Sequence, residues 1–113
     1  MKGYHDDIEE QTTGNDDFRR VLYTGHHLQL VLMTLKPGEE IGSEVHEDRD
    51  QFFRFEEGEG TVDIDDNSYA VEDGSGIVVP AGARHNVRNT GDAPLLVVSV
   101  HDSGTMQQRF LDE

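Results

Sequence analysis

The sequence contains no cysteine among its 113 residues. Disulfide scaffolds, thiolate zinc sites, iron–sulfur clusters and cysteine nucleophiles are therefore excluded. Any metal ion that the protein binds must be held by histidine, aspartate, glutamate or amide oxygen. The length itself allows one domain and little more.

Positive charge is also scarce, because 9 lysines and arginines face 24 aspartates and glutamates, for a net charge of −15. This balance argues against a nucleic-acid partner, which needs a cationic patch to neutralise phosphates, and against an anionic membrane surface. Two interpretations of the acidic excess stay open. A hydrated anionic surface is typical of a halophilic protein in concentrated, screening salt, but the same charge also serves solubility alone.

Long apolar runs are missing as well. No run of about 18 apolar residues is present, and the first residues, Met1 to Asp7, are acidic where a signal peptide would be basic and then apolar. We therefore expect a soluble, cytoplasmic protein with no membrane partner. The hydrophobic share is 34%, and these residues gather in short dense runs, which favours a small β core over disorder.

Apolar and β-branched residues form strand-length runs separated by glycine, proline, asparagine and aspartate. The expected strands span residues 18–23, 28–35, 51–55, 61–65, 68–71, 76–79, 85–89 and 95–101, with a tight turn at Asp66 and Asn67. No stretch has the period of a long amphipathic helix. The pattern predicts an all-β fold, either a sandwich or a barrel.

Three parts of the chain differ in character. Residues 1–17 are polar and are expected to form an N-terminal arm, residues 18–102 the β domain, and residues 103–113 a C-terminal tail. Within this tail, Thr105 and Gln108 are spaced to cap a short helix. Inside the β domain, Leu28–Leu35 is apolar on both faces, so we expect the core to bury one face and a packed neighbour or partner subunit the other.

Two clusters of glycine, proline and polar residues have fixed spacings beside the expected strands. The first cluster reads Gly38, five residues, Glu44, one residue, His46, four residues, Gln51, six residues and Gly58. The second reads Gly74, five residues, Pro80, one residue, Gly82, two residues, His85, three residues and Asn89. The glycines and the proline suit the turns of any small β fold, whereas the polar residues between them are candidates for a site.

These spacings follow the two sequence motifs of the cupin family, and the resemblance covers roughly residues 28–100. The second motif matches at every fixed position. The first departs at two, with Glu44 where the family most often has histidine and Gln51 where it most often has glutamate. The chain thus resembles a small single-domain cupin. The resemblance implies a double-stranded β-helix, or jelly roll, of antiparallel strands, and a homodimer for which the doubly apolar strand offers a physical motive.

The same residues predict a metal site. Glu44 and His46 share a face if their segment is extended, and Gln51 can join them from the start of the next strand. His85 would complete the set from a later strand. Two imidazoles, a carboxylate and an amide oxygen suit one divalent transition metal ion, namely Fe, Mn, Ni, Co or Zn. The alternative is that Glu44 and Gln51 are hydrogen-bonded lining of an empty pocket.

The walls of this pocket can be predicted from strand parity. Phe53 and Phe55 share parity with Gln51, so we expect both to face the interior as an apolar wall. His101 ends the last long strand and is a third candidate for the lining. As a general acid or base that is not itself a ligand, the sequence offers His101, Tyr23 or Tyr69.

Fold analogy alone cannot name a reaction. The leading hypothesis is a divalent-metal cupin that binds or acts on a small oxygen-bearing molecule, by oxygenation or isomerisation. The second is a non-catalytic module for a small ligand, such as a sugar, or for the metal itself. The third is a structural dimer with a vestigial site. No catalytic residue is assigned, and whether the protein is an enzyme stays open at this point.

Overall fold

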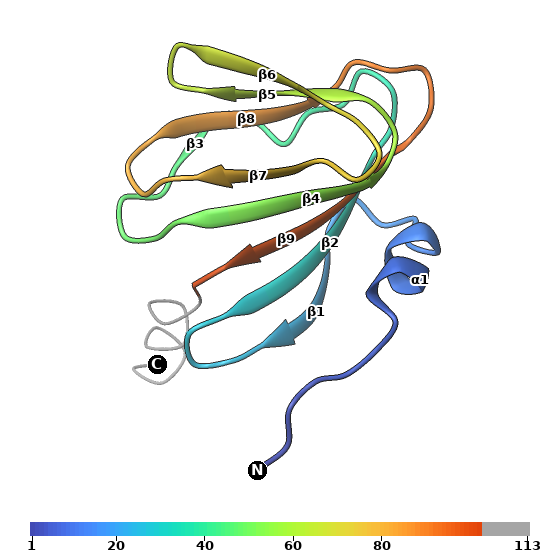
Figure 1. The fold of residues 1–113 in the computed structure, drawn as a ribbon, viewed down its shortest axis with the longest axis vertical. Helices are drawn as coiled ribbons and strands as arrows, with labels where there is room; N and C mark the ends of the chain where they lie inside the picture. Colours follow the sequence, from blue (N-terminus) through green and yellow to red (C-terminus); the bar gives the residue numbers. More distant parts are fainter. Residues whose placement is uncertain (103–113) are drawn as a thin grey trace.

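Two antiparallel sheets face each other in the computed structural model, which describes residues 1–102 (Figure 1). The tail at 103–113, with its expected helix, lies outside the described residues. Within them the elements are α1 (Ile8–Thr13), β1 (Arg20–Thr24), β2 (Gln29–Leu35), β3 (Glu44–Val45), β4 (Gln51–Glu57), β5 (Gly60–Ile64), β6 (Asn67–Val71), β7 (Gly76–Val79), β8 (Arg84–Asn89) and β9 (Leu95–His101). The prediction of an all-β fold is confirmed.

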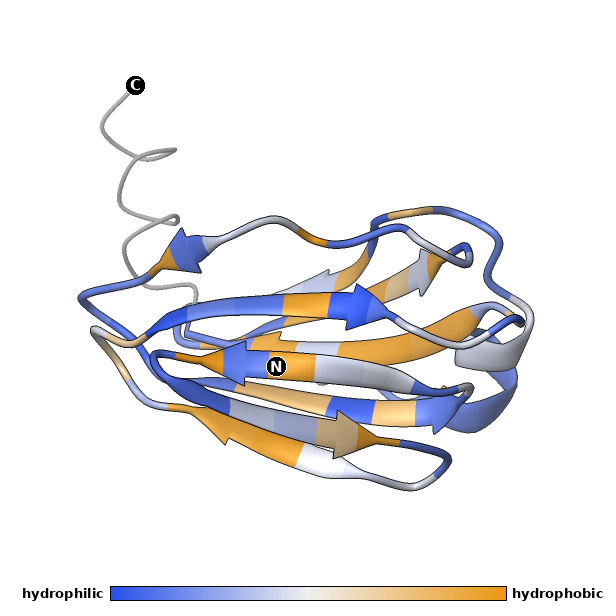
Figure 2. Cartoon of the chain, turned by 90° about the horizontal axis from the view of Figure 1, so that it is seen from above, coloured by the Kyte–Doolittle hydropathy of each residue, from blue (hydrophilic) through white to orange (hydrophobic). Residues whose placement is uncertain are grey.

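The larger sheet has the strand order β1-β2-β9-β4-β7, and the smaller sheet has the order β3-β8-β5-β6. Every pairing between these strands is antiparallel. Hydrophobic residues alternate with polar ones along the strands, and the connecting loops are mostly hydrophilic (Figure 2). Among residues 1–102, no helix has the length and apolar character that crossing a membrane requires.

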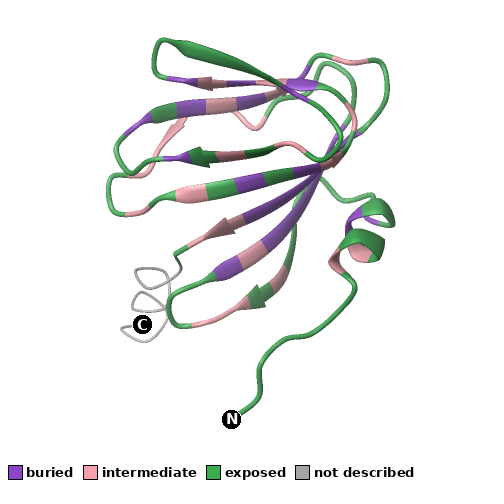
Figure 3. Ribbon diagram, in the orientation of Figure 1, coloured by how far each residue is buried: buried purple, intermediate pink, exposed green. Residues whose placement is uncertain are grey.

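The interior between the sheets changes character from one end of the strands to the other. Near one end of the larger sheet, Gln29, His101 and Gln51 are aligned across β2, β9 and β4. Further along, Met33, Val97 and Phe55 occupy the same inward positions, and all three are buried. Figure 3 shows the burial concentrated along these central strands. The apolar end carries the core, which leaves the polar end available for a site.

One predicted turn lies a residue earlier than expected. The structure ends β5 at Ile64 and pairs it with Asn67, so the turn consists of Asp65 and Asp66 and not of Asp66 and Asn67. Asp65 adopts a positive φ of 51°, which aspartate tolerates better than most residues. Its carboxylate also accepts a hydrogen bond from the backbone N–H of Arg84. The alternation of apolar and polar residues continues through Asp65 and therefore gave no signal for this boundary.

The N-terminal arm contains a helix that the sequence analysis did not predict. The side chain of Asp7 caps α1 by accepting a hydrogen bond from the backbone N–H of Glu10. The arm is then tied to β2, because the Thr34 hydroxyl donates to the Asn15 backbone carbonyl and accepts from the Asn15 side-chain amide. Asn15 is 3% exposed, so this part of the arm belongs to the folded body.

The N-terminal arm also helps to explain why both faces of β2, the doubly apolar strand, are buried. On β2, Leu32 and Thr34 point away from the core and are nonetheless buried, and α1 packs against the neighbouring strands β9 and β4. Part of the outer face is therefore covered within one chain. Beyond the arm, Phe52 and Val78 on the same outer face are exposed. The homodimer stays a prediction.

Candidate metal centre

Three of the four predicted ligands converge between β3 and β8. Glu44 and His85 are directly opposite each other across this strand pair, and His46 follows β3 by one residue. The candidate ligand atoms of Glu44, His46 and His85 all lie within 4.8 Å of one another. The extended course of the chain at Glu44 and Val45 puts the Glu44 side chain on the same face as His46, as the spacing predicts.

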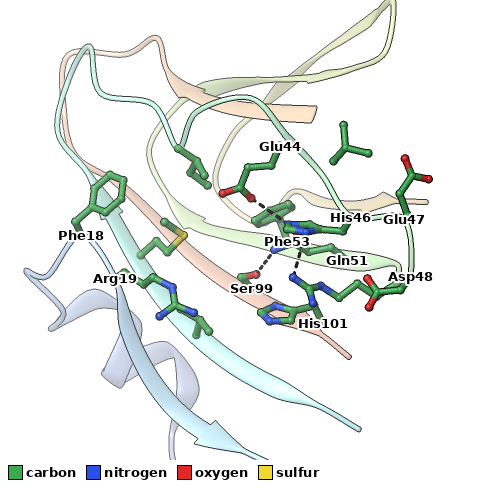
Figure 4. A pocket seen from close by; sticks show the side chains of 15 residues that line it. Phe18, Arg19, Glu44, His46, Glu47, Asp48, Gln51, Phe53, Ser99 and His101 are labelled. Atoms are coloured by element: carbon green, nitrogen blue, oxygen red, sulfur yellow. Dashed lines mark hydrogen bonds and ion pairs between the residues drawn. The ribbon is translucent and has the colours of Figure 1, made fainter. Parts of the chain in front are cut away.

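His46 lies between a carboxylate and a guanidinium (Figure 4). Its Nε2 is 3.1 Å from Glu44 Oε2, and its Nδ1 is 3.1 Å from Nη2 of Arg49. An arginine N–H can only donate, so Nδ1 accepts and Nε2 carries the proton that it donates to Glu44. The side chains of His46 and Glu44 are 23% and 43% exposed, so this half of the centre is open to solvent.

His85 is the buried half of the centre, with 2% exposure. Its Nδ1 is 3.3 Å from the Ala83 backbone carbonyl, which can only accept, so Nδ1 carries the proton. In the neutral ring Nε2 then keeps its lone pair, and it is buried with no hydrogen-bond partner among residues 1–102. The ring packs beside those of His46 and Phe53, at centroid distances of 5.4 and 6.2 Å. This protonation state is the one in which histidine binds a metal.

Gln51 starts β4 and lines the same pocket as Glu44 and His46. Its Nε2 donates to the Ser99 hydroxyl over 2.8 Å. Its Oε1 is buried and has no hydrogen-bond partner within the described part of the chain. A buried carbonyl oxygen without a partner is costly, so its position is explained best by a ligand or ion that it contacts.

The pocket has a volume of about 510 Å³ and is lined by Phe53, Val31 and Met33 on its apolar side. Phe53 thus lies where parity predicts it. Phe55 is fully buried one layer deeper, stacked on Phe53 at 6.5 Å, and belongs to the core instead of the lining. The pocket is within the range that small-molecule sites occupy.

His101 also lines the pocket (Figure 4). Burial, followed by the nearby positive charges of Arg49 and Arg19, lowers the pKa of His101 to about 4. The imidazole is therefore neutral near pH 7. Of the other two candidates for acid or base, Tyr23 stacks on Tyr4 and Tyr69 is 46% exposed on β6, and neither lines this pocket.

The pocket is also lined by two arginines that the sequence analysis did not single out. Arg49 lies in the loop between His46 and Gln51, and Arg19 precedes β1 and donates to Gln29 Oε1 over 3.3 Å. Polar loop residues are ordinarily assigned to solvent, so nothing in the local pattern marks Arg49. For Arg19 the available signal was parity, because it alternates with Arg20 on a strand-like segment.

The motif glycines are architectural. Gly38, Gly58, Gly74 and Gly82 all have positive φ values, between 84° and 105°. At Gly58 a Cβ atom would also lie 2.6 Å from the Pro94 carbonyl oxygen, so this turn requires glycine in two ways. Among them, Gly58 directly follows β4 and Gly82 lies just before β8, two strands that carry site residues.

Comparison with known proteins agrees with this geometry. The sequence model of the cupin domain family matches residues 31–101, which is more than half of the chain. The chain belongs to the cupin family. The double-stranded β-helix predicted from the motifs is confirmed, since the fold matches solved cupin-type structures.

Several bacterial proteins are similar to this cupin in sequence or in structure. The uncharacterized protein YrkC of Bacillus subtilis is 42% identical over 116 residues, covering 93% of this chain and 62% of YrkC. The chain thus spans about three fifths of that curated relative. The crystal structure of BH2720 from Bacillus halodurans has 43% identity and a TM-score of 0.88, covering 89% of this chain and 81% of that chain. TT1209 from Thermus thermophilus has 26% identity and a TM-score of 0.76, covering 87% and 95%.

Cupins often bind a metal ion, and the residues of this chain fit one. The candidate ligand atoms of a glutamate and two histidines lie within 4.8 Å of one another, and the contact of His85 Nδ1 with the Ala83 carbonyl leaves Nε2 of the neutral ring available for a metal. Within residues 1–102, His85 Nε2 and Gln51 Oε1 are buried with no hydrogen-bond partner, as is His101 Nδ1 in the pocket, and these atoms supply the independent observation. Two imidazoles with a carboxylate suit a divalent transition metal better than calcium or magnesium, which prefer oxygen ligands.

Proposed function

We propose that this cupin holds one divalent transition metal ion (Fe, Mn, Ni, Co or Zn) and binds a small oxygen-bearing molecule in the adjoining pocket. Glu44, His46 and His85 would hold the ion, with Gln51 as a neutral fourth ligand. The observation that carries the proposal is His85 Nε2, a buried lone pair that has no protein partner in residues 1–102 and lies with the Glu44 and His46 ligand atoms. A structural histidine buried to 2% exposure would be expected to satisfy both ring nitrogens.

The bound ion would supply Lewis-acid polarisation of an oxygen ligand or activation of dioxygen. The chain's own residues provide the rest. Phe53, Val31 and Met33 pack against the molecule and exclude water from it. Gln51 adds an oxygen ligand without adding negative charge, which leaves the ion more electrophilic than a second carboxylate would. Ser99 fixes the orientation of the Gln51 amide.

Oxygenation or isomerisation is the reaction class that this ligand set favours, because two histidines and one carboxylate with open positions are typical of non-haem iron oxygenases. His101 is the proton acceptor available in the pocket, since its low pKa keeps the imidazole neutral. At neutral pH its protonated form is scarcely populated, so His101 does not serve as a general acid. A non-catalytic module for a small ligand is the second candidate, and the weak basicity of His101 is what favours it.

Oxygen uptake by the Fe(II)-loaded protein separates these two functions. The protein is loaded anaerobically, exposed to a panel of small phenols and diketones, and followed with an oxygen electrode. Substrate-dependent uptake that disappears in His85→Ala and persists in Arg54→Met, a change on the outer face of β4, supports catalysis. A silent panel, with the same compounds retained by the metal-loaded protein and recovered unchanged, supports the binding module. Failure of the wild-type protein to take up any of the five metals would contradict the metal site and leave the non-catalytic binding module.

A further inference from the structure

The contact between Arg49 and His46 constrains how a metal can enter the centre. Arg49 Nη2 donates to His46 Nδ1 over 3.1 Å, and the opposite ring nitrogen donates to Glu44 over 3.1 Å. Both nitrogens of His46 are therefore already in use. This differs from His85, whose Nε2 is free among the described residues.

A metal bound to His46 is incompatible with this contact, whichever nitrogen it uses. If the ion binds Nε2, the proton of the neutral ring moves to Nδ1, which then faces the Arg49 donor with a donor of its own. If the ion binds Nδ1, it takes the lone pair that Arg49 uses. In both cases the guanidinium must leave His46 when the metal arrives.

The released guanidinium remains at the pocket. Arg49 lines it, and Arg49 Nε is buried and finds no hydrogen-bond partner in residues 1–102 even before the release. Arg19 lines the same pocket. Arg19 and Arg49 are two of the chain's 9 lysines and arginines, and they share the cavity with the carboxylates of Glu44, Glu47 and Asp48. A buried or half-buried guanidinium needs an anion, and a carboxylate matches its donors in a bidentate arrangement.

We propose that Arg49 exchanges partners: it caps His46 in the metal-free centre and, once a metal displaces it, binds the carboxylate group of a small anionic ligand next to the metal, with Arg19 adding positive charge. The substrate class of the proposed metal site is then a small organic carboxylate. This inference rests on the proposed function, because it needs the metal at His46.

The competing arrangement is that the released Arg49 turns to the acidic residues of the rim. Glu47 and Asp48 both line the pocket and are exposed. Glu44 is committed to the metal in the proposed centre. If Arg49 pairs with the rim, it makes no contribution to the affinity for a charged ligand. The affinities for a charged and an uncharged ligand of the same shape therefore distinguish the two arrangements.

Two titrations of the full chain test the exchange. In the first, Ni(II) is titrated into the metal-free wild type, Arg49→Met and the surface control Arg54→Met by calorimetry. In the second, the Ni(II)-loaded proteins are titrated with benzoate and with benzamide, which have nearly the same shape but differ in charge. Benzoate is a weak chelator, so it does not strip the metal.

Arg49→Met should bind Ni(II) at least as tightly as the wild type, because no guanidinium competes for His46. The same variant should bind benzoate roughly tenfold more weakly or worse, the effect of one charge-assisted hydrogen bond, with benzamide within about twofold. Arg49→Lys should restore part of the benzoate affinity, and Arg54→Met should match the wild type. A residue that only supports the fold would lower both affinities, so it would not show opposite effects on metal and anion.

Three results would overturn the proposal. Weaker Ni(II) binding by Arg49→Met means that Arg49 supports His46 instead of competing with the metal. Unchanged benzoate affinity means that Arg49 pairs with the rim. Equal losses of benzoate and benzamide affinity mean that Arg49 shapes the pocket but does not interact with the charge of the ligand. Absence of Ni(II) binding by the wild type is a separate failure, visible in the first titration, that contradicts the proposed function and the exchange with it.

Discussion

Asn89 and His85 are two polar side chains on the same inward face of β8, with almost equal exposures of 3% and 2%. Both polar atoms of the Asn89 side chain have hydrogen-bond partners. Its amide donates to the Leu35 and Ala93 carbonyl oxygens over 2.9 and 2.8 Å, and its carbonyl accepts from the Gly91 N–H over 2.9 Å. His85 has one weak hydrogen bond and leaves Nε2 unpaired within residues 1–102.

The two side chains differ in how many of their polar atoms have hydrogen-bond partners, and not in how deeply they are buried. A fully satisfied buried amide stabilises the fold, here by joining the end of β2 to the loop before β9. A buried lone pair that the protein leaves open costs stability and is retained where a ligand completes it. Asn89 at the end of β8 therefore stabilises the fold, whereas His85 near its start is available to a ligand, although the family motif contains both residues.

Loss of Asn89 should produce the largest effect. Asn89→Ala leaves two carbonyl oxygens and one N–H without their partners, so the free energy of unfolding should fall by about 3 kcal/mol. Urea titration followed by circular dichroism measures this. The metal affinity of the folded fraction should be unchanged. A stability loss below about 1 kcal/mol would contradict the structural role assigned to Asn89.

Replacement of His85 should have the opposite profile. His85→Leu removes an unpaired buried nitrogen and fills a similar volume, so the free energy of unfolding in the absence of metal should change by less than about 1 kcal/mol. The metal affinity should fall at least about a hundredfold, as expected when a ligand is lost. Calorimetric titration and urea titration give both numbers. If stability fell as far as in Asn89→Ala, His85 would be a structural residue like Asn89.

Gln51 extends the comparison because its Oε1 is another buried acceptor without a partner in the described chain. Gln51→Glu restores the charge that the family most often has here and should tighten divalent metal binding about tenfold. In the absence of metal it should destabilise the fold by about 1 kcal/mol, because a carboxylate is desolvated. Gln51→Met, which has no ligand oxygen, is the matched control. Equal metal affinities for all three proteins would place Gln51 outside the centre.

The smallest effect is expected on the outward face of the same strand. Arg88 Nε donates to Asp63 Oδ2 over 3.0 Å, and the hydrogen bonds from Ser68 and Arg88 lower the pKa of Asp63 below its usual value of 3.8. A lowered folded-state pKa stabilises the fold above the unfolded pKa, and this contribution is lost as the pH falls through the folded value. Because the pair is solvent-exposed, Asp63→Asn should cost no more than about 0.5 kcal/mol at pH 7.

Unfolding of Asp63→Asn and the wild type, compared at pH 7 and below pH 4, checks the sign. The difference between the two proteins should shrink at the lower pH, since the wild-type carboxylate becomes protonated there. A difference that grew on acidification would show that Asp63 is not stabilised as a carboxylate.

Much of the β framework could be predicted from the sequence because its signals are local. Gly76–Val79 and Leu95–His101 are strands with the predicted bounds. The helix at Ile8–Thr13 was missed because six residues show little period. The cap formed by Asp7 and Glu10 was the available signal. The depth of Phe55 could not be read from parity, which gives the direction of a side chain but not its distance from the pocket.

The site could be predicted only as a set of ligands. The spacing of Glu44, His46 and His85 gave the group that the structure brings together. The protonation state of His85 depends on the Ala83 carbonyl, and the state of His46 depends on Arg49 in a loop. These are contacts of three-dimensional geometry, and neither periodicity nor motif spacing contains them.

The most direct test of the account is the metal content of the protein purified without an affinity tag or chelator. Elemental analysis compares the wild type with His46→Ala, His85→Leu and the surface control Arg54→Met, before and after reconstitution with Fe(II), Mn(II), Ni(II), Co(II) and Zn(II). The account predicts close to one divalent ion per chain in the wild type and in Arg54→Met, and loss of the ion in both histidine variants. Full metal content in His85→Leu, or none in the reconstituted wild type, would contradict it.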